Sequence, residues 1–270
     1  MKKITKKQQH AIHALAYMQE LFAAYPLTEL VYTTPFQLLV AVIMSAQTTD
    51  KQVNKVNEQF FRVVERPEDI VALGESGVGE IIKTVGLWKS KTTNLVKMAH
   101  QLTINDGQLP INGNSKIVFD AVAADTIRPY AKKVNNDINI REQQRQYADA
   151  QALYNDRWYR IPDTIDEITK LPGVGIKTAK VVLYILYGQR RVAVDTHVHR
   201  VMNRLGIVAT NTPEQTSVVL ETIIPDERKD IAHRVIIYFG RYWCMAKKPN
   251  CVACKLKEVC VRYQQQKKKL

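Results

Sequence analysis

Apolar residues recur every three or four positions through most of the chain, which is the spacing of amphipathic helices. Residues 8–24 form the first such segment, which Pro26 ends. Residues 36–44 follow Thr34 and Pro35 and are apolar almost throughout, so we predict a helix at the centre of a core. The apolar positions of the first segment are Ile12, Leu15, Ala16, Met18, Leu21 and Phe22.

The rest of the chain continues this helical pattern. Asp50 is predicted to cap the next helix, whose inner face carries Val53, Val56 and Phe60. Further helices are expected near 213–224 and 227–240. The extended run at 192–194 is too short to count as a strand, so the predicted fold class is all-α.

Residues 164–187 predict two helices joined by a tight glycine hairpin. Thr164 and Glu167 have the spacing of a capping box, and Gly173 and Gly175 permit a sharp reversal. The first turn of the second helix then has free N–H groups beside two glycines, which suits a phosphodiester. A plain turn between helices is the alternative. The predicted buried stripe of the second helix is Ile176, Ala179, Val182, Leu183 and Leu186.

Two charged residues near this hairpin are candidates for chemistry. Lys177 stands in the first turn of the second helix, where the positive end of the helix dipole disfavours its ammonium form. A neutral lysine amine is a nucleophile for Schiff-base formation. Asp195 has the position of an N-cap, and Gly206 is predicted to end the helix that it begins.

The stretches LPGVGIKTAKVVL (171–183) and VAVDTHVHRV (192–201) together resemble the helix-hairpin-helix DNA glycosylase superfamily. The similarity is greatest to its endonuclease III branch, which comprises bifunctional glycosylases and abasic-site lyases. The resemblance implies that Lys177 and Asp195 are catalytic and that the substrate is duplex DNA with oxidised pyrimidines. Ile176 stands where this family usually has a basic residue, which we expect to weaken the grip on DNA slightly.

The resemblance also implies residues that contact DNA. Gln47, in the turn SAQTTD (45–50), matches a residue that fills the gap left by an extruded base. Leu87 matches a residue that is inserted into the duplex. Leu171, Gly173 and Gly175 belong to the hairpin. Read without the resemblance, Gln47 is an ordinary polar turn residue and Leu87 a buried loop leucine.

Charge and length agree with a nucleic-acid-binding protein. The chain has 270 residues and a net charge of +13, which attracts polyanions such as DNA, although a merely basic enzyme would have the same charge. It has no run of eighteen apolar residues and no secretion signal at its start. We therefore expect a cytoplasmic protein. We further expect it to be a monomer and to associate with the nucleoid.

All four cysteines lie in one C-terminal window: Cys244, Cys251, Cys254 and Cys260. Such clustering argues against a disulfide framework and for a metal or cluster site. Four thiolates can ligate iron–sulfur or zinc, and a redox dithiol is a further alternative. The spacing resembles the [4Fe–4S] loop of the endonuclease III branch. In that family the loop holds a basic surface in shape, so Lys247 and Lys248 are expected to contact phosphates.

The resemblance covers nearly the whole chain except residues 111–160. This stretch is too long for a plain connection, and we predict a helical insertion without assigning it a function. The expected domains are 28–189, which carries the hairpin and the insertion, and 1–27 with 190–270, which carries the cluster.

Two other functions remain open. A sister glycosylase of different base specificity is one, although monofunctional adenine glycosylases usually lack the hairpin lysine that Lys177 matches. A non-catalytic helix-hairpin-helix DNA-binding protein is the other, and the pairing of Lys177 with Asp195 argues against it.

Overall fold

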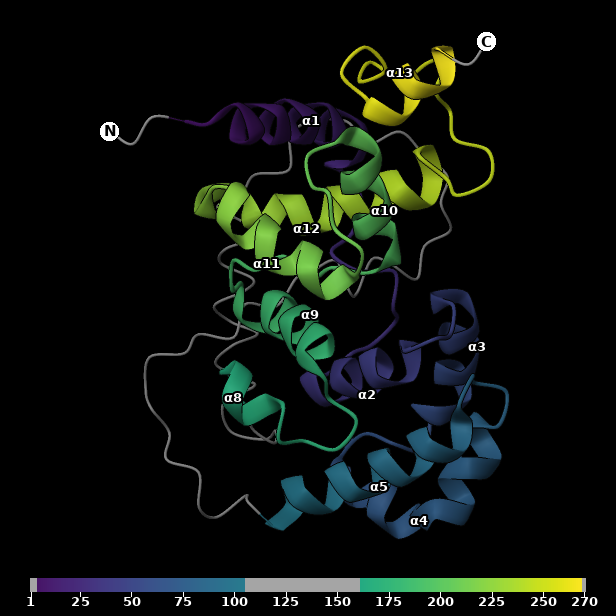
Figure 1. Cartoon of the computed structure of the whole chain (residues 1–270). Helices are drawn as coiled ribbons and strands as arrows, with labels where there is room; N and C mark the ends of the chain where they lie inside the picture. The colour runs from purple at the N-terminus through teal and green to yellow at the C-terminus, as the bar shows by residue number, and fades with distance from the viewer. Residues whose placement is uncertain (1–3, 105–160, 269–270) are drawn as a thin grey trace. The chain divides into compact units, whose positions relative to one another are not determined.

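The computed structural model describes residues 4–104 and 161–268, and these ranges are helical without strands, as predicted (Figure 1). The predicted insertion at 111–160 lies outside the described residues. The chain divides into two compact units, Thr28–Gly188 and Met1–Leu27 with Gln189–Leu270.

Helix α2 (Pro35–Ser45) is the centre of unit 28–188. Residues 35–44 are all buried, as the unbroken apolar run predicts. Such a helix needs neighbours on several sides, and α2 packs against α3, α5 and α9. The other helices of this unit are α3 (Asp50–Phe60), α4 (Pro67–Ile82), α5 (Trp88–Ile104), α8 (Ile165–Ile168) and α9 (Ile176–Tyr187).

Local capping explains where these helices begin. The Thr34 side chain accepts a hydrogen bond from the amide of Gln37, and Pro35 occupies the first helical position. The N-cap of α3 is Thr49, so the prediction that Asp50 caps this helix was wrong by one residue. Asp50 instead lies in the first turn, where its carboxylate interacts favourably with the positive end of the helix dipole.

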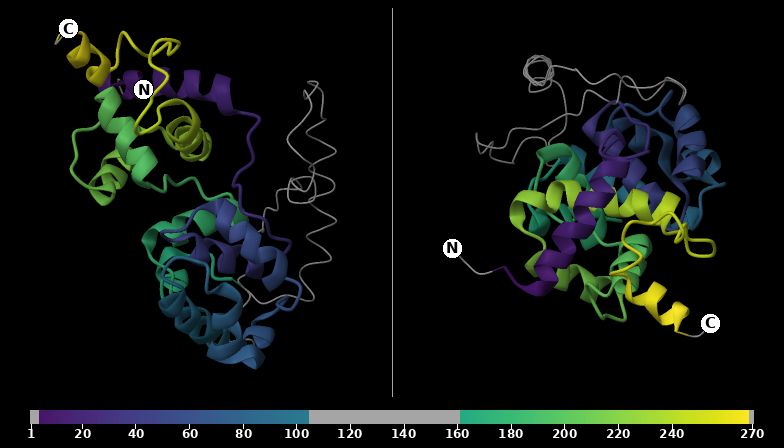
Figure 2. Two further views of the ribbon diagram at one scale, coloured as in Figure 1. Left: turned by 90° about the vertical axis from the view of Figure 1, so that its right-hand side faces the viewer. Right: turned by 90° about the horizontal axis from the view of Figure 1, so that it is seen from above.

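The second unit joins the two ends of the chain. Helix α1 (Lys6–Phe22) packs against α12 (Lys229–Tyr238), more than 200 residues later, and α12 also contacts α10 (Thr196–Leu205) (Figure 2). The remaining elements are α11 (Pro213–Ile223), the 3₁₀ turn η2 (Asp226–Arg228), the π-helical turn η3 (Phe239–Trp243) and α13 (Val261–Lys267). The helix expected at 227–240 thus begins two residues later than predicted.

Aromatic residues close the core of this unit. Phe239 packs edge-on against Tyr17 and Phe22, with ring centroids 6.1 and 6.4 Å apart. Met18 is fully buried beside them, whereas Ala16 is exposed, contrary to the predicted stripe. Tyr17, an amphipathic residue that the prediction omitted, takes that place in the core.

No helix in the described ranges is both long and apolar enough to cross a membrane.

Gly206, which ends α10, provides a test of this packing. Its φ is +75°, and a Cβ there would overlap the Val261 side chain of α13. We expect Gly206→Ala to lower the free energy of unfolding by about 1–3 kcal/mol, because the backbone strain and the steric overlap act together. Thermal unfolding followed by circular dichroism measures the change.

The control is Gly175→Ala, since Gly175 has φ −88° and a Cβ there meets nothing within 4 Å. Gly175→Ala should lower the free energy of unfolding by less than about 1 kcal/mol. Equal losses for both variants would show that α13 does not pack on Gly206 as described.

Candidate functional site

The glycine hairpin between α8 and α9 is anchored by its own buried apolar side chains. Leu171 and Val174 are 3% and 6% exposed. Gly173 has φ +84°, and an added Cβ would lie 3.1 Å from Asn94 Cβ and 3.2 Å from Ile43 Cγ2. Glycine is therefore required here by both backbone conformation and packing. Because the Leu171 side chain is buried, this residue can offer DNA only its backbone.

The N-terminus of α9 is open. Gly175 is its N-cap, no side chain caps it, and nothing lies within 4 Å of a Cβ built on Gly175. The amides of the first helical turn therefore have no acceptor within the helix. Ile176 is 58% exposed beside them, so its predicted place in the buried stripe was wrong; Ala179, Val182, Leu183 and Leu186 of that stripe are buried.

Lys177 lies in this first turn, as predicted, and the structure shows that it is exposed. The preceding helix α8 begins at Thr164, whose hydroxyl accepts from the amide of Glu167 at 3.2 Å. This is the first of the two hydrogen bonds of the predicted capping box. The hairpin thus presents a lysine and a set of free amides on one short, firmly seated turn.

Asp195 is the N-cap of α10, as predicted. Its Oδ1 accepts hydrogen bonds from the amides of His197 and Val198, both at 2.8 Å. Both bonds use the same oxygen, so capping occupies one half of the carboxylate. The two amides belong to the first turn of α10, so the helix itself fixes the orientation of the carboxylate.

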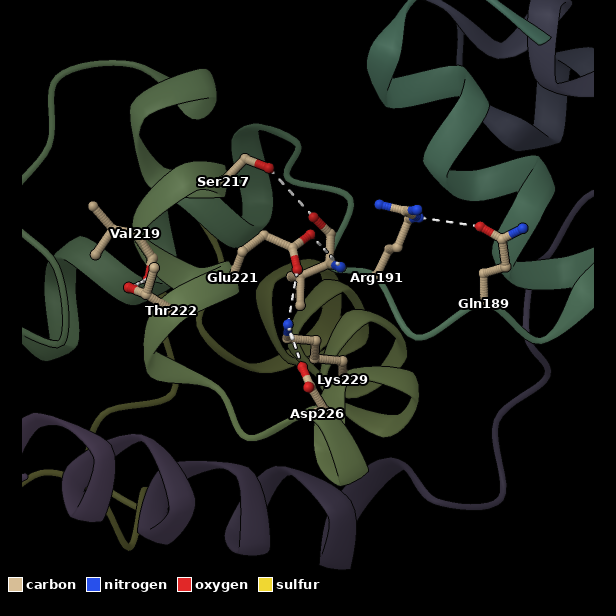
Figure 3. Close-up of polar contacts among 9 residues, drawn as sticks. Gln189, Arg191, Ser217, Val219, Glu221, Thr222, Asp226 and Lys229 are labelled. Carbon is tan, nitrogen blue, oxygen red and sulfur yellow. Dashed lines mark hydrogen bonds and ion pairs between the residues drawn. The ribbon is translucent and has the colours of Figure 1, made fainter. Parts of the chain in front are cut away.

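The segment that precedes Asp195 is held by Glu221, which belongs to an ionic network with Lys229 and Asp226 (Figure 3). The amide of Val192 donates to Glu221 Oε1 at 3.2 Å. Lys229 Nζ lies 3.1 Å from the Glu221 carboxylate and 2.6 Å from that of Asp226. Figure 3 shows Lys229 between these two carboxylates. The Lys229 side chain is only 10% exposed and that of Glu221 25%, whereas Asp226 is 81% exposed, so the network runs from the interior to the surface. The network fixes the register in which the chain reaches Asp195.

Lys177 and Asp195 belong to different units, Lys177 to 28–188 and Asp195 to the unit that joins both ends of the chain. The structure places each residue firmly within its own unit.

Gln47 and Leu87 share an unusual backbone. Among the residues that the structure describes, they are the only non-glycine residues with positive φ, at +55° and +57°. Both are exposed, Leu87 by 57%, so Leu87 is not a buried loop residue. Their loops touch: the amide of Gly86 donates to Thr48 Oγ1 at 3.1 Å, and a Cβ on Gly86 would lie 2.8 Å from the Gln47 carbonyl oxygen.

Sequence reasoning missed a buried lysine beneath these loops. Lys91 is 4% exposed, and its Nζ bonds to the carbonyl oxygens of Met44 and Ala46 and to Thr48 Oγ1. A signal for it was present: Lys91 precedes Leu95 by four positions and Met98 by seven, so it falls on the apolar stripe of α5.

The four cysteines line one pocket together with aromatic and apolar residues, among them Phe239, Trp243 and Leu205. All four are free thiols. Burial raises the pKa of the Cys254 and Cys260 thiols, and the neighbouring Cys244 sulfur adds to that effect. In the described part of the chain, no three His, Cys, Asp or Glu side chains converge closely enough to form a closed metal site. The thiols nevertheless fit a thiolate-bound group, because they face a common space.

Arg204 shapes the loop that begins at Cys244, a contact that sequence reasoning also missed. Its guanidinium donates to the carbonyl oxygens of Cys244, Met245 and Ala246 at 3.2, 2.8 and 2.9 Å, and to Cys244 Sγ at 3.3 Å. The next two residues, Lys247 and Lys248, are exposed. Arg204 therefore fixes the loop from which both lysines project.

Comparison with known proteins extends this picture. Residues 40–226 match the family model described as HhH-GPD superfamily base excision DNA repair protein. Endonuclease III of Rickettsia conorii is 37% identical over 238 residues, 88% of this chain and 89% of the relative. Endonuclease III of Haemophilus influenzae is 34% identical over 236 residues, 87% and 88% of the two chains.

A solved structure is also similar. It is titled a trapped endonuclease III–DNA covalent intermediate, has 31% identity and a TM-score of 0.74, and the match covers 98% of this chain and 100% of that one. Helical fold, glycine hairpin and sequence similarity agree, and the chain belongs to the helix-hairpin-helix superfamily of base excision DNA repair proteins.

Proposed function

We propose that this protein is a bifunctional DNA glycosylase and abasic-site lyase that removes oxidised pyrimidines from duplex DNA. The observation that carries the proposal is the exposed Lys177 in the first turn of α9, beside the uncapped amides at Gly175. Similarity to endonuclease III, including a structure titled as a trapped covalent intermediate with DNA, supports it.

The hairpin would bind the DNA backbone. The amides that follow Gly175 point toward open space and lie at the positive end of the helix dipole, so they suit a phosphate oxygen. Neither the backbone conformation nor the packing of this chain requires glycine at 175, whereas a phosphate that approaches the backbone closely would.

Lys177 would act as the nucleophile. Its neutral amine attacks C1′ of the damaged nucleotide; the C1′–N bond breaks, and the base leaves with the bonding pair and takes up a proton. The sugar ring opens to a Schiff base between C1′ and the lysine nitrogen. Loss of a C2′ proton then expels the 3′ phosphate by β-elimination, and water releases the enzyme.

Asp195 would assist this attack. One carboxylate oxygen caps α10, which fixes the group, and the other is available to accept the lysine proton or to stabilise positive charge on the sugar. The Glu221–Lys229 network would serve the same end by fixing the segment before Asp195.

Gln47 and Leu87 would open the duplex. Extrusion of a base costs a few kcal/mol of stacking, and residues inserted in its place offset that cost. Both side chains are exposed on touching loops, in a backbone conformation that is set before DNA binds.

We further propose that Cys244, Cys251, Cys254 and Cys260 hold a [4Fe–4S] cluster, which makes residues 1–27 with 190–270 the cluster domain. A bound cluster would tie together the loop that carries Lys247 and Lys248, and these lysines would contact phosphates. The fit rests on the pocket that all four thiols line.

The Schiff base gives the most direct test. Borohydride should trap the wild-type protein covalently on a duplex with an abasic site, and Lys177→Ala should give no adduct because the attacking amine is gone. Lys180→Ala, one turn further along α9, is the control and should still be trapped. A folded wild type that gives no adduct would leave only the DNA-binding function.

Asp195 serves both as a cap and in the proposed chemistry, and two substitutions separate these roles. Asp195→Asn keeps a good N-cap, so the melting temperature should change little while the glycosylase rate falls by about 10²-fold or more. Asp195→Ala should show the same fall in glycosylase rate, and removal of the N-cap should also lower the free energy of unfolding by about 1 kcal/mol. Single-turnover kinetics and thermal unfolding give both quantities, and a fully active Asn variant would exclude the proposed role.

The cofactor proposal is tested on the purified protein. Iron and acid-labile sulfide should be present in equal amounts with broad visible absorption, whereas zinc would leave the protein colourless. Cys254→Ser should lose iron and colour, while Ser217→Ala in the same unit should keep both. Zinc without iron in the wild type would overturn the assignment.

A further inference from the structure

A buried positive charge lies under the two exposed loops of Gln47 and Leu87. All three ammonium protons of Lys91 have an acceptor: the carbonyl oxygens of Met44 at 2.7 Å and Ala46 at 2.5 Å, and Thr48 Oγ1 at 3.0 Å. Each acceptor is neutral. The ammonium group is therefore satisfied entirely by the end of α2 and the turn that follows it.

Such a charge is costly to keep in the interior. Burial lowers the pKa of Lys91 to about 8, because the ammonium form loses its water. The negative end of the α2 dipole and the three hydrogen bonds offset part of this cost. An apolar residue would fill the same position on the α5 stripe without the cost of burying a charge. The presence of a lysine is therefore explained by the three groups to which its ammonium bonds.

What Lys91 holds is the backbone on both sides of Gln47. Ala46 and Thr48 are the two neighbours of Gln47, and both bond to the same nitrogen. Thr48 Oγ1 also accepts from the amide of Gly86, which precedes Leu87. One ammonium group thus connects the two loops whose central residues have φ of +55° and +57°.

We infer that Lys91 is a positioning residue for a wedge formed by Gln47 and Leu87, and that it fixes both loops in their inserting conformation before DNA arrives. The inference rests on the proposed function, because it gives the wedge a use. Loops that are ordered in advance lose less conformational entropy on binding, so the removal of Lys91 should impair duplex opening rather than the chemistry of Lys177.

The competing explanation is that Lys91 merely stabilises α2. In that case any variant of equal stability loss would have the same effect on activity. Leu95→Ala is a suitable comparison, because Leu95 is fully buried on the same helix, one turn beyond Lys91.

The test is a double-mutant cycle. Single-turnover rates are measured on a duplex with one oxidised pyrimidine, for Lys91→Met alone and in the Gln47→Ala/Leu87→Ala background. We expect Lys91→Met to lower the rate by about tenfold to a hundredfold in the wild-type background and by less than about threefold in the double variant, where no wedge remains to be positioned.

A second readout separates opening from chemistry. Borohydride trapping on a single-stranded abasic oligonucleotide needs no base to be extruded, so Lys91→Met should match the wild type there. Leu95→Ala, assayed well below its melting temperature, should retain the wild-type rate on the duplex. Should Lys91→Met fail to fold, Thr48→Val removes the hydroxyl that joins both loops and should show the same pattern.

The inference would be overturned if Lys91→Met lowered the single-turnover rate equally in the wild-type and the Gln47→Ala/Leu87→Ala backgrounds, or left the rate unchanged. It would also be overturned if Leu95→Ala lowered the rate on the duplex while trapping on the single strand stayed at the wild-type level. These results would leave the proposed function intact, provided that the wild type is trapped on abasic duplex. A wild type that is never trapped would overturn the proposed function and this inference together.

Discussion

Unit 28–188 depends on the complete burial of helix α2. Ten consecutive residues that avoid water require neighbours on several sides, and α3, α5 and α9 supply them. The last turn of α2 contacts both the hairpin before α9 and a side chain of α5. The Ile43 side chain seats Gly173 of the hairpin, and the carbonyl of the next residue, Met44, accepts from Lys91. The hairpin and the two exposed loops are thus positioned by adjacent residues of one buried helix.

The last turn of α2 also explains how Gln47 and Leu87 can keep a strained backbone conformation. Residues with positive φ cost free energy unless their surroundings hold them in place. Here the surroundings are a fully buried helix, an ammonium group with three acceptors and the contact between Gly86 and the Gln47 carbonyl. The exposed side chains of Gln47 and Leu87 remain free to meet a ligand, while their backbone is fixed from beneath.

The other unit reaches a similar result by different means. Asp195 is held by the helix that it caps, and Arg204 of that helix bonds to three carbonyl groups of the cysteine loop. Helix α10 therefore links the proposed catalytic carboxylate with the loop of Lys247 and Lys248.

Sequence alone predicted the parts that local rules decide. The buried α2, the N-cap at Asp195 and the left-handed Gly206 follow from periodicity and capping. The rules failed where two residues suit one role, as with Thr49 and Asp50, and where an apolar residue ends at the surface, as with Ile176. Lys91 was missed because a lysine is normally exposed, and only the assembled loops show its three acceptors.

The pairing of α1 with α12 has a consequence for how the chain is made. Among the described helices α1 is synthesised first, yet α12, which packs against it, is synthesised more than 200 positions later. Helices α3, α5 and α9 pack against α2, and all four are complete before α12 is synthesised, so they can associate while translation continues. The apolar face of α1, which carries Ala14, Leu15 and Met18, therefore stays uncovered until α12 has been synthesised.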